Sequence, residues 1–159
     1  MRFSSLAVLV AGAFALGACA GDAERAIDTA TAGTQAPPEG TTSGAPITGR
    51  IHEVRMLFDG ARYYFDPEKL TVRRGDGVRW TMVSGAPHNV QFLPTEIPAG
   101  AAAVLAENMP RPDAPLTGPM LLSENEQYIV SFANVPPGTY GYICTPHQMV
   151  GMKGTIEVV

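Results

Sequence analysis

The chain has 159 residues, and its 11 lysines and arginines against 15 aspartates and glutamates give a formal net charge of −4 at pH 7. No basic stripe runs along the sequence, which excludes an electrostatic footprint for nucleic acid, so no nucleic-acid partner is expected.

The first 18 residues indicate an export signal. Arg2 supplies a short positive start, residues 3–16 are apolar with many small side chains, and the chain then reaches Cys19 through Leu-Gly-Ala. This segment is too short for a membrane-spanning helix, so we predict a signal peptide over 1–18. Its end resembles a bacterial lipobox, in which cleavage leaves Cys19 as a lipidated first residue. The alternative is an ordinary secretory signal, with Cys19 lost or incidental.

Residues 19–49 predict a flexible tether behind that anchor. The segment is rich in Ala, Gly, Thr and Pro, and it cannot bury enough apolar surface to offset its chain entropy. A flexible coil of this length holds a domain roughly 30 Å from its anchor on average. We therefore expect an exported, membrane-anchored lipoprotein of the periplasm or cell surface.

Residues 50–159 are enough for one domain with a single core. Short segments with alternating apolar residues are separated by turn signals such as Asp59-Gly60, which predicts an antiparallel β-sandwich. Residues 93–122 break this pattern, and we expect a short helix over 99–107 within an irregular covering loop.

Most of the candidate metal ligands lie in residues 144–152, which read CTPHQMVGM. A soft thiolate, an imidazole and a thioether in one loop suit copper better than zinc, calcium or magnesium. One more imidazole, from His88, would complete the trigonal His₂Cys site with a long axial Met that marks blue-copper electron transfer. If Cys19 carries lipid, metal ligation also explains why the other cysteine of an exported protein stays unpaired.

Strand geometry explains how these ligands could meet. Cys144 should face inward with Tyr140 and Tyr142, because residues two apart on a strand point the same way. Pro146 should stop the strand, so that His147 and Met152 return to the same ion from the loop.

Two residues compete with this assignment. Met149 is an alternative axial ligand, but it lies only two residues past His147 and leaves little chain to pass around the ion. Met152 is therefore the predicted ligand. His52 has no matching sequence context, and we expect it at the surface or at a strand edge.

Several motifs of the domain resemble plastocyanin and its cupredoxin relatives, including pseudoazurin. They cover nearly all of 50–159 and are Phe65-Asp-Pro, Val72-Arg-Arg-Gly-Asp, Val78-Arg-Trp, Pro87-His-Asn-Val-Gln-Phe, Glu96-Ile-Pro-Ala-Gly, Gly138-Thr-Tyr-Gly-Tyr-Ile-Cys-Thr-Pro-His-Gln, Gly151-Met and Gly154-Thr-Ile-Glu-Val.

The resemblance implies an all-β, eight-stranded Greek-key sandwich with one type 1 copper ion. It implies that the ligands are His88, Cys144, His147 and Met152, and that Asn89 forms hydrogen bonds near the cysteine sulfur and ties the two ligand segments together. The implied function is to shuttle single electrons between membrane or periplasmic redox proteins, as donor and acceptor. We expect a monomer.

Two departures from the plant members of this family concern docking. Those proteins place a Tyr before the ligand Cys, beside acidic clusters, whereas this chain has Ile143, which strand alternation should turn outward. The segments that should carry the clusters offer only Glu96, Glu107 and Asp113. An acidic docking surface is therefore not expected.

Three other functions compete with electron transfer. A periplasmic copper carrier often uses Met- or His-rich clusters, which the seven methionines do not form. A zinc site built from the Cys and two His would be tetrahedral and colourless. Catalysis at a second metal needs further histidines, and only His52 remains, so we predict that the protein is not an enzyme.

Overall fold

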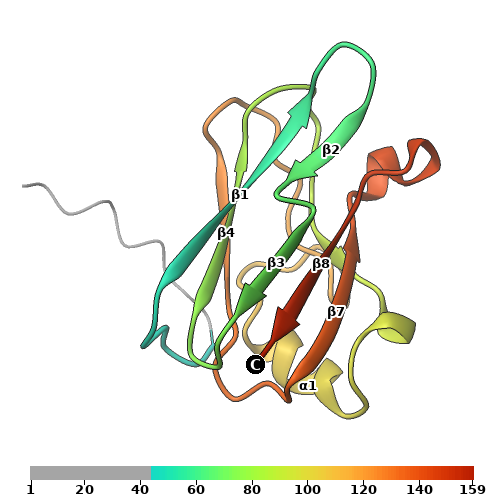
Figure 1. Cartoon of the computed structure of the whole chain (residues 1–159). Coiled ribbons are helices and arrows are strands. Elements are labelled where there is room, and N and C mark those ends of the chain that lie inside the picture. The colour runs from blue at the N-terminus through green and yellow to red at the C-terminus, as the bar shows by residue number, and fades with distance from the viewer. Residues whose placement is uncertain (1–43) are drawn as a thin grey trace, which may run out of the picture. The chain divides into compact units, whose positions relative to one another are not determined.

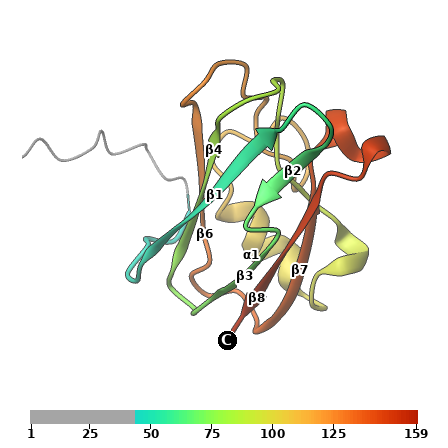
Figure 2. The same cartoon turned by 45° about the horizontal axis from the view of Figure 1, so that its top comes forward.

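The computed structural model describes residues 44–159. The predicted signal peptide, Cys19 and most of the predicted tether lie outside the described residues. Within the described part, two four-stranded sheets pack face to face (Figures 1 and 2). The strands are β1 (Ile51–Phe58), β2 (Tyr63–Asp66), β3 (Lys69–Val72), β4 (Gly77–Met82), β5 (Gln91–Phe92), β6 (Gln127–Ser131), β7 (Gly138–Ile143) and β8 (Lys153–Val158).

The strand order is β2-β1-β4-β6 in one sheet and β3-β8-β7-β5 in the other. The predicted eight-stranded β-sandwich is thus confirmed, but the expectation of antiparallel sheets is wrong. The pairs β1/β4 and β3/β8 are parallel, and all other neighbours are antiparallel. Between β1 and β4 the chain passes through β3 in the opposite sheet, and such a crossover returns a strand in the parallel direction.

The core follows from the alternation of apolar residues along the strands. On β4, Val78, Trp80 and Met82 are buried, whereas Arg79 and Thr81 alternate with them and keep partial exposure. The Trp80 ring contacts the Tyr142 ring edge to face at 5.4 Å between centroids, which joins the two sheets. Aromatic contacts of this kind add about 0.5–1.5 kcal/mol beyond their buried area.

The connection between β5 and β6 contains a short 3₁₀ helix, η1 (Pro94–Glu96), and the helix α1 (Ala101–Glu107), which confirms the helix predicted in this region. α1 buries Ala101 and Leu105 against the core. Among residues 44–159, every helix falls short of the length and apolar character that crossing a membrane requires.

Residues 44–49, which the sequence assigned to the tether, make contacts with the domain. Ala45 N–H donates to Asn108 Oδ1 at 3.0 Å, and Asn108 Nδ2 donates in turn to the carbonyl of Ala133 at 2.8 Å. Thr48 and Gly49 N–H groups both donate to the carbonyl of Gly75. This segment therefore lies against the end of the sandwich where β1 begins.

Asp76 organises the same end. Its carboxylate accepts the N–H groups of Arg50 and Arg73, each at 2.9 Å, and lies 2.8 Å from Nε2 of His52. His52, expected at the surface or a strand edge, is thus a half-buried partner of this carboxylate. Burial alone raises the pKa of Asp76, but the three hydrogen bonds outweigh burial and hold the pKa below its usual range.

We expect Asp76→Asn to lower the free energy of unfolding by about 1–3 kcal/mol at pH 7, because an amide nitrogen cannot accept the bonds from Arg73 and His52. Urea unfolding measures the change. Asp66→Asn is the matched control, because Asp66 makes only an exposed ion pair with Arg55 and should cost about 0–1 kcal/mol.

The acid dependence provides a second check on Asp76. The lowered pKa of Asp76 in the folded state adds to the stability of the protein. This contribution is complete well above pH 3.8, the ordinary pKa of an Asp, and it is lost as the pH falls through the lower pKa of the folded state. The difference in stability between the wild type and Asp76→Asn should therefore shrink below that pH. A difference that stays constant down to strong acid would contradict this role.

Candidate metal centre

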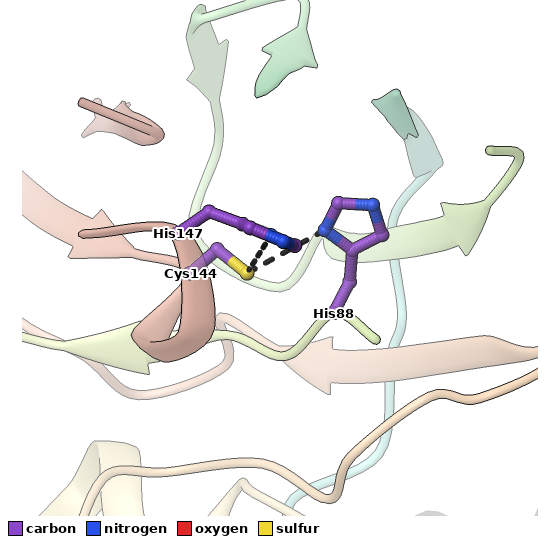
Figure 3. A group of neighbouring side chains, drawn as sticks. All are labelled: His88, Cys144 and His147. Atoms are coloured by element: carbon purple, nitrogen blue, oxygen red, sulfur yellow. Dashed lines mark hydrogen bonds between the residues drawn. The ribbon is translucent and has the colours of Figure 1, made fainter. Parts of the chain in front are cut away.

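The predicted ligands meet where the loops after β4 and β7 come together, at the end of the sandwich remote from the starts of β1 and β4 (Figure 1). Cys144 directly follows β7 and precedes the 3₁₀ helix η2 (Thr145–Val150), which contains His147. His88 lies in the loop between β4 and β5. Potential donor atoms of Cys144, His88 and His147 lie within 4.8 Å of one another (Figure 3).

The side chains point their donor atoms at a common centre. Cys144 Sγ lies 3.5 Å from Nδ1 of His88 and 3.4 Å from Nδ1 of His147. Nε2 of His88 lies 2.9 Å from the carbonyl oxygen of Ser84. A carbonyl only accepts, so Nε2 carries the proton and Nδ1 presents its lone pair towards the sulfur.

These distances fit one small metal ion. Donor atoms that bind the same ion at about 2.0–2.3 Å lie about 3.5 Å apart. Burial lowers the pKa of both His88 and His147, which favours the neutral imidazole that a metal needs. Burial raises the pKa of the Cys144 thiol and outweighs the backbone N–H groups of Asn89 and His147, which act to lower it. A cation would therefore displace the thiol proton on binding.

Asn89 links the two loops, as the resemblance implied. Its side-chain Oδ1 accepts the N–H of Thr145 at 2.7 Å, and its own backbone N–H is directed at the Cys144 sulfur. The side chain is almost fully buried, so the bond is shielded from competing water. The loop carrying His88 is therefore fixed relative to the loop carrying Cys144.

The two candidate methionines lie in different surroundings. Met152 is fully buried, and its backbone closes the ligand loop. Its N–H donates to the carbonyl of His147 at 3.2 Å, and its carbonyl accepts the N–H of Cys144 at 3.1 Å. Met149 is 95% exposed on the surface of the loop. Only Met152 is thus positioned in the interior beside Cys144.

Tyr63 is a residue of the site that the sequence did not reveal. Its ring stacks on the His147 imidazole with centroids 3.7 Å apart and planes 11° from parallel, and Phe58 stacks on Tyr63 at 4.5 Å. Phe58 ends β1 and Tyr63 begins β2, so this hairpin supplies an aromatic support for His147. The sequence showed only an aromatic-rich strand here, without indicating its partner.

Ile143 lies on the outer face of its sheet, as strand alternation predicts, and lines a surface pocket with Glu68 and Lys153. Yet only 6% of it is exposed. Its strand β7 is flanked by β5 and β8, where Gln91 and Lys153 are its partners in register. Neighbouring side chains therefore cover it, because an interior strand leaves little open surface even on its outer face.

Comparisons with known proteins agree on one family. Residues 52–159 match the family described as copper binding proteins, plastocyanin/azurin family. The plastocyanin of Synechococcus sp. is 39% identical over 114 residues, covering 71% of this chain and 76% of that protein. The plastocyanin of Scenedesmus fuscus is 37% identical over 105 residues, covering 66% and 96%. Oxidised plastocyanin from Dryopteris crassirhizoma has a similar structure, with a TM-score of 0.51, 30% identity and coverage of 68% of this chain and 100% of that one.

We expect Tyr63→Leu to release the His147 ring and to lower the stability of the metal-free protein by about 1 kcal/mol, the size of a lost aromatic pair. In NMR spectra, the His147 ring protons should move downfield, because they no longer lie over an aromatic face. Tyr63→Phe should leave both properties almost unchanged.

Tyr64→Leu serves as the control for the Tyr63 variants. Tyr64 is the next residue on β2 and lies beneath the Arg62 guanidinium instead of His147. If Tyr64→Leu moved the His147 signals as far as Tyr63→Leu does, the stack would not be what holds this ring.

Proposed function

Since this chain belongs to the plastocyanin/azurin family of copper-binding proteins, we propose that His88, Cys144, His147 and Met152 hold its copper ion. The protein is a blue copper electron-transfer protein with one copper, and it is not an enzyme. The observation that carries the ligand assignment is the convergence of one thiol and two imidazole Nδ1 atoms at a buried point. The full burial of Met152 beside Cys144 supports the fourth position.

A bound copper ion supplies a one-electron couple between Cu(II) and Cu(I). The residues supply a site that changes little between those states, because each donor is fixed by a separate contact. The carbonyl of Ser84 orients His88, the Asn89 amide is directed at Cys144, and the Tyr63 ring supports His147. Ligands held in this way need little rearrangement when the charge changes, which favours rapid transfer.

We propose that electrons enter and leave through His147. It is the only one of the three clustered donors that is not fully buried. The residues of the two ligand loops around it carry no charge and would form an apolar rim for a weak encounter: Gly85, Ala86, Pro87, Pro146, Met149 and Val150. Of these, Met149 and Val150 are 95% and 62% exposed.

We also propose the protein's setting in the cell. The apolar residues 3–16 followed by Cys19 support export to the periplasm or cell surface, with a lipid anchor on Cys19. Its partners would then be membrane or periplasmic redox proteins that act as donor and acceptor, and a single copy of the chain would suffice for the exchange.

The purified, copper-loaded and oxidised protein should be intensely blue and should bleach on one-electron reduction, because a thiolate beside two imidazoles gives strong sulfur-to-copper charge transfer. Cys144→Ser should abolish the colour while the circular dichroism spectrum keeps its β signature. Stoichiometric copper without colour or redox activity would indicate a copper carrier instead.

Met152→Gln should lower the reduction potential and change the visible spectrum, because a weak thioether favours the softer Cu(I) over Cu(II). Met149→Gln is the matched control and should change both much less, since this side chain is almost fully exposed. Cyclic voltammetry measures the potentials. A larger effect at Met149 would reverse the assignment of the axial ligand.

Electron transfer to the native partner should slow by about tenfold in Val150→Glu, because placing an unpaired charge in an apolar interface costs at least about 1.4 kcal/mol. Met149→Lys should act similarly, and both variants should keep the copper spectrum. Stopped-flow rates should change little between low and moderate salt, since screening acts on exposed charges. A steep salt dependence with no effect of either substitution would indicate docking at a charged surface elsewhere.

A further inference from the structure

We propose that the end of the sandwich opposite the metal centre is a membrane-facing surface, at which Arg50, Arg73 and Arg74 bind anionic phospholipid headgroups. This inference rests on the proposed lipid anchor at Cys19. It would direct the copper end away from the bilayer and towards partners on the aqueous side.

The path of the chain supports this orientation. Residues 44–50 lie at the end where β1 begins and β8 finishes, away from η2 (Figures 1 and 2). The hydrogen bonds of Ala45 to Asn108, and of Thr48 and Gly49 to Gly75, fix the segment there. The point at which the domain joins its N-terminal 43 residues is therefore at this end. Any anchor on Cys19 thus connects to the domain from the side of the three arginines.

The three arginines at this end differ from three of the other four arginines within residues 44–159, since Arg111 also has no ion pair. Within residues 44–159, no carboxylate lies within 4.0 Å of Arg50, Arg73 or Arg74, and all three are exposed. By contrast, three arginines elsewhere have acidic partners: Arg55 with Asp66, Arg62 with Asp59 and Glu68, and Arg79 with Glu53. The unpaired guanidinium groups remain available for phosphate, which they bind through two parallel N–H bonds.

The acidic groups near these arginines have other partners. Asp76 is 7% exposed and its oxygens are occupied by the Arg50 and Arg73 N–H groups and by His52. Glu157 accepts the hydroxyl of Thr139. Asp76, Glu157 and the carboxylate of Val159 keep their negative charges and equal the three arginines in number. Asp76 is buried, however, so the exposed guanidinium groups outnumber the exposed carboxylates among these groups.

The shape and polarity of this end also fit a headgroup layer. An open hollow of about 660 Å³ is lined by the three arginines together with Thr48, Thr71, Val159 and the Asp76–His52 pair. Two exposed apolar side chains, Ile51 and Val159, are 43% and 60% exposed at the same end. A surface that combines guanidinium groups with apolar side chains matches the boundary between headgroups and acyl chains.

When the domain is anchored, even a weak contact with the membrane is enough to orient it. Each basic residue close to an anionic bilayer strengthens binding about fivefold, and the effect fades beyond about one Debye length. A lipid on Cys19 would keep the domain close to the bilayer, which corresponds to an effective concentration of about millimolar. Contacts too weak to recruit a free protein would therefore still orient an anchored one.

Vesicle co-sedimentation of the mature-length chain, residues 19–159 with Cys19→Ser, tests the surface without the lipid. We expect binding to phosphatidylcholine vesicles that contain about 30% phosphatidylglycerol, none to pure phosphatidylcholine, and loss of binding between about 0.05 and 0.5 M salt. The triple variant Arg50→Gln, Arg73→Gln, Arg74→Gln should bind at least about tenfold more weakly.

The matched control is the triple variant Arg55→Gln, Arg62→Gln, Arg79→Gln, which removes the same charge from paired arginines and should retain wild-type binding within about twofold. Equal losses in both variants, or binding that ignores phosphatidylglycerol, would overturn the proposal. Binding to soluble polyglutamate but not to anionic vesicles would overturn it in favour of an acidic protein partner. If the triple variant folds poorly, the single variants Arg50→Gln, Arg73→Gln and Arg74→Gln decide the question, since each should weaken binding about fivefold.

The outcome is separable from the proposed function. The vesicle assay involves neither copper nor a lipid on Cys19, so its failure leaves electron transfer intact. Mass spectrometry of the exported protein tests lipidation by itself, and the copper spectrum tests the metal site by itself.

Discussion

The hydrogen bond from the Thr145 amide to Asn89 Oδ1 is the constraint on which the metal centre depends. It closes the gap between a loop that leaves one sheet after β4 and a loop that leaves the other sheet after β7. Without it, the loop carrying His88, which arrives from β4 in the other sheet, would be joined to the Cys144 strand only further along, where β5 pairs with β7. With it, the two sheets act as rigid supports for a single buried cluster of donors.

Much of this arrangement could be predicted from local rules. The period of two along a strand predicted that Cys144 faces inward with Tyr140 and Tyr142, and all three are buried. The short chain between His147 and Met149 favoured the later methionine, and the burial of Met152 agrees with that reasoning. Such predictions succeed because they depend only on neighbours within a few positions in the sequence, where backbone geometry limits the choices.

Contacts between distant segments could not be predicted in the same way. Nothing in the residues around Tyr63 indicates that its ring will stack on His147, because that contact depends on how the β1–β2 hairpin leans over η2. The parallel pairs β1/β4 and β3/β8 likewise depend on which sheet each strand joins. The packing of residues 44–49 was missed because a segment poor in large apolar residues is held here by backbone hydrogen bonds to Gly75 and Asn108.

The parallel pairing of β3 with β8 has a consequence for how the molecule is made. The last strand of the chain is the neighbour of one of the first, so the second sheet cannot be completed until residues 153–158 are available. A growing or partly translocated chain therefore presents His88 long before Cys144 and Met152 can join it. Because such long-range pairings form slowly, the four proposed ligands come together late in folding, when the last strand joins the second sheet.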